Sequence, residues 1–260
     1  MKYMGGKYKL KNKIANIMKD LIKSEDVDGY LEPFCGAGSI LTIMNKEYDC
    51  TASDYHPDLI ALWKSVQDKT FNPPTEMTEE LYLEIKHSPS PSALKAFVGF
   101  GCSFGGKYFS GYADKYKNSK KENYLQEITN SINKKTHDFQ GIRFDCCSYD
   151  KWDPHNMLIY CDPPYQTTKF PIKYRTSVKE YDIFDNEHFW DIMREWSKDN
   201  YVFISETSAP PDFVKVWSNP THRSASQSDK TRYKNPSETF TEEILFVHSS
   251  FAKDVLNKNT

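Results

Sequence analysis

The chain has 260 residues, 38% of them hydrophobic and 27% charged, and its formal net charge is −2. This composition is typical of a folded globular protein of one or two domains, and it excludes a disordered tail. No apolar run is long enough to span a membrane, the opening residues do not resemble a signal peptide, and the six cysteines contain no CxxC pair. We therefore expect a cytoplasmic protein with reduced thiols and no metal site.

The first third of the chain alternates between helix and strand patterns. Apolar residues recur at helical spacing from Ile14 to Ile22, and Pro57 suits the first turn of a helix. The elements expected here are, in order, a helix over 14–22, a strand over 29–33, a glycine-rich turn over 34–39, a helix from about 39, a strand over 49–53 that ends at Asp54, and a helix from 56–57.

The pattern changes after residue 68. Proline-rich breakers occupy 71–74 and 88–92, glycines are interspersed with aromatics and lysines over 93–117, and 120–136 resembles a polar helix. We expect residues 69–136 to form an inserted, mostly helical lobe that contacts the substrate. Its lysines indicate either a solvated face or a surface for nucleic acid; they are Lys107, Lys115, Lys117, Lys120, Lys121, Lys134 and Lys135.

Strand and helix patterns return in the last half. Strands are expected over 141–148, 157–161, 201–205 and 243–248, and a helical stripe runs from Phe189 to Trp196 with Asp185 as its N-cap. The alternation predicts a doubly wound α/β domain, formed by residues 1–68 and 137–260 and interrupted by the lobe over 69–136.

The motif Asp162-Pro163-Pro164-Tyr165 directly follows the apolar run 157–161, which reads as a buried strand. Ligands of open α/β sheets bind at this end of the strands. Asp162 supplies a hydrogen-bond acceptor, the prolines have no N–H and leave their carbonyls available, and Tyr165 supplies a flat ring. This combination suits a planar ring that carries an amino group, such as a nucleobase, although a rigid turn is the plain alternative.

The turn Phe34-Cys35-Gly36-Ala37-Gly38 lies between a strand and a helix, and Asp54 ends the next strand. Glycines let a ligand approach the backbone, and a carboxylate about 20 residues further on can accept both ribose hydroxyls of an adenosine cofactor. Leu41 stands where the full dinucleotide fingerprint has its third glycine. A cofactor without phosphates is therefore favoured over a dinucleotide.

With these motifs in this order, the chain resembles the adenine-specific DNA methyltransferases, and more narrowly the DNA adenine methylase (Dam) family of alpha-ordered amino-methyltransferases. The opening segment Tyr3-Met4-Gly5-Gly6-Lys7, the late strand Phe203-Ile204-Ser205 and the final Glu243-Ile244-Leu245-Phe246 also match the family pattern. The stretch Ser103 to Tyr108 is more similar to phage-type members than to the bacterial type that reads GATC. The resemblance covers nearly the whole chain.

The resemblance implies a Rossmann-like methyltransferase fold that uses S-adenosylmethionine. The cofactor would contact Tyr3, Lys7, Phe34, Gly36, Gly38, Asp54 and Asp162. Asp162, Pro163, Pro164 and Tyr165 would hold a flipped adenine for methylation of its 6-amino group. The lobe over 69–136 corresponds to the target-recognition domain, and DNA would contact Lys107, Tyr108, Tyr112, Lys115 and Arg232.

Several alternatives remain open from the sequence. An N(4)-cytosine DNA methyltransferase needs a similar pocket but more often has Ser at the position of Asp162. An RNA or protein-amide methyltransferase more often has Asn there. A non-catalytic DNA-binding relative is disfavoured by the intact Asp162, Asp54 and glycine turn. A restriction endonuclease partner fits this class of enzyme, and the sequence leaves the oligomeric state open.

Overall fold

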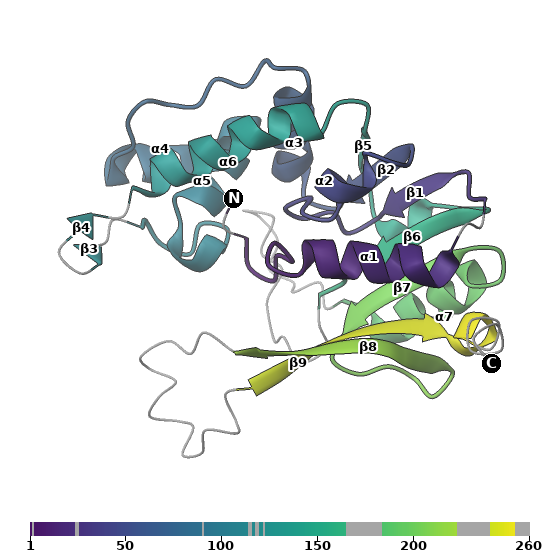
Figure 1. The fold of residues 1–260 in the computed structure, drawn as a ribbon. Helices are drawn as coiled ribbons and strands as arrows, with labels where there is room; N and C mark the ends of the chain where they lie inside the picture. The colour runs from purple at the N-terminus through teal and green to yellow at the C-terminus, as the bar shows by residue number, and fades with distance from the viewer. Residues whose placement is uncertain are drawn as a thin grey trace. The chain divides into compact units, whose positions relative to one another are not determined.

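The computed structural model describes residues 1, 3–23, 26–89, 91–113, 116–117, 120–121, 123–164, 184–222 and 240–252. Within these ranges the chain folds into the helices and strands labelled in Figure 1. The helices are α1 (Lys11–Ile22), α2 (Leu41–Met44), α3 (Pro57–Gln67), α4 (Glu79–His87), α5 (Ala93–Gly101), α6 (Tyr124–Asp138) and α7 (Asn186–Trp196), with 3-10 turns η1 (Phe104–Gly106) and η2 (Tyr149–Lys151). The strands are β1 (Gly29–Glu32), β2 (Cys50–Asp54), β3 (Tyr116–Lys117), β4 (Lys120–Lys121), β5 (Arg143–Cys146), β6 (Met157–Cys161), β7 (Tyr201–Glu206), β8 (Phe213–His222) and β9 (Phe240–His248).

The chain divides into two compact units. Unit 1 contains Met1–Asn16 and Gly29–Trp152, and unit 2 contains Ile17–Asp28 together with the described residues of 153–164 and 184–252. The predicted boundaries of an inserted recognition domain at 69–136 divide the chain differently, and they stay a prediction.

Unit 1 is built on three parallel strands in the order β5-β2-β1. All four residues of β1 are buried, as expected for a parallel strand covered on both faces. The helix α3 begins at Pro57, as the sequence predicts, because a proline in the first helical turn has no N–H that would need a partner. Its apolar side packs the fully buried Trp63 into the core of this unit.

The helix α5 was missed in the sequence interpretation, which treated 93–117 as a glycine-rich segment. The Ser92 side chain caps its first turn by accepting the Lys95 N–H at 3.1 Å. The helix is buried from Lys95 to its end, and a Cβ on Gly101 would lie 1.9 Å from Ile128. The helical glycines therefore allow close packing against neighbouring side chains, and they do not mark a loop.

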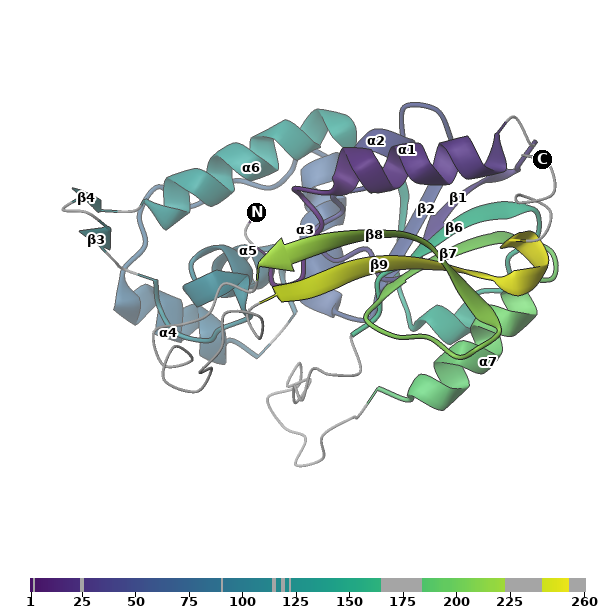
Figure 2. The same ribbon diagram turned by 60° about the horizontal axis from the view of Figure 1, so that its bottom comes forward.

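Unit 2 has four strands in the order β6-β7-β9-β8. β6 and β7 run parallel, whereas β9 is antiparallel to both β7 and β8. Figure 2 shows β8 and β9 as a long adjacent pair; β8 was not predicted. The predicted N-cap of α7 is confirmed, because Asp185 accepts the His188 N–H at 3.0 Å. The parallel strands and intervening helices of the two units confirm the predicted α/β, Rossmann-like class.

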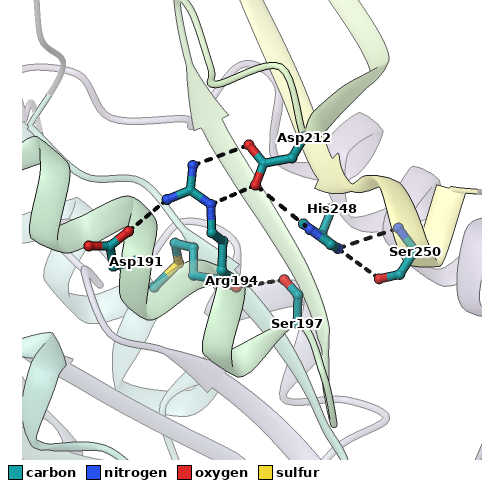
Figure 3. Close-up of polar contacts among 7 residues, drawn as sticks. Asp191, Arg194, Ser197, Asp212, His248 and Ser250 are labelled. Atoms are coloured by element: carbon teal, nitrogen blue, oxygen red, sulfur yellow. Dashed lines mark hydrogen bonds and ion pairs between the residues drawn. The ribbon is translucent and has the colours of Figure 1, made fainter.

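A polar cluster holds α7 to the strands of unit 2 (Figure 3). Arg194 donates from Nε to Asp212 at 2.6 Å, which lowers the pKa of the Asp212 carboxyl, and from Nη1 to Asp191 at 2.7 Å. His248 Nε2 lies 3.8 Å from Asp212, and its Nδ1 lies 2.7 Å from the Ser250 hydroxyl. His248 is at the carboxyl end of β9, which is antiparallel to β7. The cluster therefore lies near the amino end of β7, away from the carboxyl ends of β6 and β7. Its contribution is therefore to stability.

Candidate active site

The glycine turn, residues 34–38, joins β1 to α2 in unit 1. Gly36 and Gly38 have φ angles of +45° and +60°, a backbone region that favours glycine. A Cβ on Gly38 would lie 2.6 Å from the Phe139 ring, and a Cβ on Gly36 would lie 3.0 Å from the Tyr3 ring. Both glycines are therefore required by the backbone conformation and by the aromatic rings that face them.

Asp54 fixes the turn to the end of β2. Its Oδ2 accepts the Gly36 N–H at 3.0 Å, and its Oδ1 accepts the His56 N–H at 2.9 Å. Burial raises the pKa of the Asp54 carboxyl, and the two N–H donors oppose that rise. Each carboxylate oxygen has a second lone pair, so the side chain retains the capacity to accept further hydrogen bonds.

The other predicted cofactor contacts of unit 1 are Tyr3, Lys7 and Phe34, and their surroundings differ. Tyr3 faces Gly36, and its ring centroid is 4.9 Å from that of Phe100. Lys7 is buried, with Nζ donating to the Gly5 carbonyl at 3.2 Å. Phe34 is half-buried within the turn, and its ring is 5.1 Å from that of Tyr149. The structure thus brings Tyr3 to the glycines, while the cofactor roles of all three residues stay predictions.

Three further side chains contact or adjoin the turn and were not assigned to it from the sequence. Trp63 Nε1 donates to the Gly36 carbonyl at 2.9 Å, and Lys135 Nζ donates to the Ala37 carbonyl at 2.5 Å. Tyr55 directly follows Asp54 and is 57% exposed. Its adjacency to Asp54 was a usable sequence signal, whereas nothing in the sequence links Trp63 or Lys135 to the turn.

The Asp162-Pro163-Pro164 segment begins where β6 ends, as predicted. Asp162 is half-buried, Pro163 is buried and Pro164 is exposed. The segment places a carboxylate and a proline carbonyl in succession at the carboxyl end of a buried strand, where α/β proteins bind ligands. Tyr165, the predicted stacking residue, lies outside the described residues.

The strand register fixes the start of this segment. Cys161 is paired with Ile204 of β7, so Asp162 follows the last paired step of the parallel ladder. One residue earlier, the Tyr160 hydroxyl and the Ser205 hydroxyl form a buried hydrogen bond of 2.8 Å between the two strands. Asp162 therefore directly follows a strand whose register with β7 is fixed up to Cys161.

The predicted DNA contacts have mixed environments. Lys107 is exposed. The Tyr108 hydroxyl donates to Asp58, and the Tyr112 hydroxyl donates to the Met77 carbonyl at 2.7 Å. Both tyrosines are half-buried, and their hydroxyl groups already form hydrogen bonds within unit 1. Lys115 and Arg232 lie outside the described residues, and DNA contact by the whole set stays a prediction.

The described part of the chain contains no cluster of three or more His, Cys, Asp or Glu side chains able to hold a metal ion. In the same ranges, no helix has the length and apolar character needed to cross a membrane. All six cysteines are free thiols.

The chain matches known proteins along most of its length. The family model described as D12 class N6 adenine-specific DNA methyltransferase matches residues 3–97 and 102–242. DNA adenine methylases of two Vibrio cholerae serotype O1 strains are each 26% identical over 190 residues. The type II methyltransferase M.MjaIII of Methanocaldococcus jannaschii is 21% identical over 226 residues, which cover 72% of this chain and 75% of that protein.

The aligned regions set the extent of these similarities. The Vibrio alignments cover 64% of this chain, which in turn spans 64% of the length of each Vibrio protein. The family model covers both the glycine turn with Asp54 in unit 1 and the Asp162-Pro163-Pro164 segment in unit 2. The chain therefore belongs to the D12 class N6 adenine-specific DNA methyltransferase family.

Proposed function

We propose that this protein is an enzyme that transfers a methyl group from S-adenosylmethionine to the 6-amino group of adenine in DNA. The observation that carries the proposal is the Asp162-Pro163 step at the end of buried β6, in a chain that belongs to this family. The family is adenine-specific by name, which favours adenine over cytosine as the target base.

The residues of the glycine turn fit S-adenosylmethionine. Side chains at Gly36 and Gly38 would meet the Tyr3 and Phe139 rings, so the turn presents only backbone at these two positions. Asp54 retains lone pairs for the two ribose hydroxyls. Leu41 is buried in α2 at the position of the third glycine of the dinucleotide fingerprint, which permits close helix–strand packing there, and the incomplete fingerprint favours a cofactor without phosphates. We assign Tyr3, Lys7 and Phe34, together with the exposed ring of Tyr55, to the lining of this site.

The target nitrogen is activated by its two hydrogen-bond acceptors. The lone pair of an adenine 6-amino group is delocalised into the ring, which makes it a poor nucleophile. The Asp162 carboxylate and the Pro163 carbonyl accept its two N–H bonds and favour a tetrahedral nitrogen with a localised lone pair. Bound S-adenosylmethionine supplies an electrophilic methyl group on a sulfonium. The nitrogen would gain that methyl as the methyl–sulfur bond breaks and the sulfonium becomes a thioether, and it would release one proton to solvent, without a covalent enzyme intermediate.

An adenine within duplex DNA must leave the base stack to reach these acceptors. Base flipping costs about a few kcal/mol. Stacking of the flipped base on the Tyr165 ring offsets this cost by roughly 1–3 kcal/mol. The remaining rate enhancement comes from holding the nucleophile and the methyl group in line.

The decisive experiment is incubation of the purified protein with labelled S-adenosylmethionine and, in separate reactions, unmethylated DNA of mixed sequence, RNA or protein. Nucleosides are then released and identified by mass spectrometry. We expect N6-methyladenine in wild-type reactions. N4-methylcytosine without methyladenine would replace the adenine assignment with a cytosine one, and label in RNA or protein but not in DNA would remove the DNA assignment. Cofactor binding with no transfer to any of them would indicate a non-catalytic relative.

The partners follow from the same proposal. Binding to DNA through lysines of 69–136 predicts an affinity that falls steeply as salt rises, since phosphate contacts release counterions. An affinity that does not change with salt would exclude this segment from phosphate contact. The type II name of the M.MjaIII relative favours a restriction endonuclease partner, and the enzyme would act in the cytoplasm of a bacterial or phage-infected cell.

A further inference from the structure

The sequence places Lys135 among the lysines of a basic cluster, but in the structure its side chain is only 8% exposed. Its ammonium group lies over the Phe139 ring, 4.7 Å from the centroid, and 5.3 Å from the centroid of the Trp63 ring. It donates to the Ala37 carbonyl at 2.5 Å and points to the Gly38 carbonyl at 3.4 Å. Lys135 therefore contacts the glycine turn from α6, almost 100 positions away in the sequence.

Asp54, Trp63 and Lys135 together bond to four successive peptide groups of the turn. Trp63 donates to the Gly36 carbonyl at 2.9 Å, and Asp54 accepts the Gly36 N–H at 3.0 Å. The carbonyls of Gly36, Ala37 and Gly38 are thus directed toward α3 and α6. Because a glycine-containing turn has many accessible conformations, these bonds select one of them.

Placing an ammonium group here is unfavourable unless it makes strong hydrogen bonds. Burial, with a smaller contribution from Lys11, lowers the pKa of Lys135 to about 8, and nearby acidic groups oppose that shift. An unbranched apolar side chain such as Met would fill the space between the same rings. The specific contribution of the lysine is therefore its charge-assisted bonding to the turn carbonyls, which exceeds that of a neutral donor.

We propose that Lys135 is a positioning residue that holds the glycine turn in the conformation that accepts the cofactor. Its effect on the turn is independent of the ligand, whereas its effect on affinity rests on the proposed use of S-adenosylmethionine. Because Lys135 belongs to α6, its bonds link the turn to the helix at the end of the 69–136 segment.

The test compares Lys135→Met with Lys134→Met, which removes an exposed lysine from the preceding position of the same helix. The first readout is hydrogen–deuterium exchange of the ligand-free protein. We expect faster exchange over residues 36–39 in Lys135→Met only, with melting temperature as the check on folding. Wild-type exchange rates in this variant would overturn the proposal.

The second readout is the affinity for S-adenosylhomocysteine, measured by calorimetry. Lys135→Met is expected to weaken binding about tenfold, the loss typical of one hydrogen bond from a charged group. Lys134→Met should bind as the wild type does. If exchange quickens but the wild type itself binds no S-adenosylhomocysteine, the proposed function fails while the positioning of the turn stands.

A pH profile separates positioning from packing. Wild-type affinity should fall about threefold as pH rises through 8 and Lys135 loses its proton, whereas the affinity of Lys135→Met should lack this step. The groups that interact electrostatically with the ammonium are unchanged in the variant, which makes the difference specific; they are Lys11, Glu32, Cys35, Asp138 and the Met1 amino group. If Lys135→Met does not fold, Lys135→Gln keeps a neutral donor and must show the same missing step, and an unchanged step in it overturns the proposal.

Discussion

The glycine turn of unit 1 and the Asp162-Pro163-Pro164 segment of unit 2 are held in place by different interactions. Side chains from β2, α3 and α6 bond to the backbone of the turn. The segment after β6 instead takes its position from the parallel ladder and from the Tyr160–Ser205 bond. The turn thus depends on a few long-range side chains, whereas the motif depends on the register of a strand. Substitutions in the two regions should therefore have different consequences.

The largest expected effect is on catalysis, at the end of β6. Asp162→Ala removes a proposed acceptor of the target amino group but leaves the strand ladder intact. We expect turnover to fall by about a thousandfold or more, the scale of losing a group that stabilises the transition state electrostatically. Thermal unfolding should be close to that of the wild type. The control is Asp153→Ala, since that side chain is 94% exposed just before β6; substantial methylation by Asp162→Ala would remove Asp162 from the mechanism.

The next effect is on cofactor affinity, at the turn. Both carboxylate oxygens of Asp54 accept a backbone N–H. Asp54→Asn replaces one of these oxygens with an NH2 group, which cannot accept a hydrogen bond. Hydrogen bonds to a charged group contribute about 1.5–3 kcal/mol, so the dissociation constant for S-adenosylmethionine should rise about 10- to 100-fold. Equilibrium binding measures it, with the exposed Asp68→Asn as the control. Equal affinities in the two variants would exclude Asp54 from the cofactor site.

A third effect tests whether the turn is sensitive to packing as well as to hydrogen bonding. Gly38→Ala adds a Cβ 2.6 Å from Phe139 at a φ of +60°, whereas Gly105→Ala adds one at a φ of +66° with nothing within 4 Å. Both alanines are strained, by about 1 kcal/mol, but only the first must also displace a ring, at about 1–3 kcal/mol more. Chemical denaturation should therefore rank Gly38→Ala as clearly less stable than Gly105→Ala. Equal losses would mean that Phe139 yields without cost.

The smallest effect is expected between the strands. Tyr160→Phe removes the hydroxyl that bonds to Ser205 but keeps the ring and the ladder. The free energy of unfolding should fall by about 1 kcal/mol, with methyl transfer reduced only slightly. Ser205→Ala should cost a similar amount, because each variant leaves one buried hydroxyl without this partner. A large loss of transfer in Tyr160→Phe would show that the motif depends on this bond more than on strand register.

Much of the candidate site could be predicted because it follows local rules. Asp54 and Asp162 end or follow strands that have clear apolar patterns, and Asp185 and Pro57 carry ordinary helix-start signals. The α/β class and the family follow from the order of these motifs. The roles assigned to the site residues themselves stay predictions.

What could not be predicted depends on tertiary contacts. The glycines of α5 read as helix breakers, yet they are there because Ile128, Tyr108 and Phe109 pack directly against them. Lys135 reads as one lysine of a basic stretch, and only the fold shows that it is buried against the turn. β8 was missed, and its pairing along the whole of β9 appears only in the folded sheet.

The environment of the cysteines has a practical consequence for chemical labelling. Cys35 lies within the glycine turn, and burial together with Asp54 and Glu32 raises the pKa of its thiol well above the usual range. Only thiolates react readily with maleimides and oxidants, so Cys35 stays inert. Partial burial and Asp54 also raise the pKa of the Cys146 thiol, but Cys146 is exposed at the end of β5, so such a reagent reaches it before the buried Cys35. A fluorophore can thus be attached to the native chain there, without alkylating the turn.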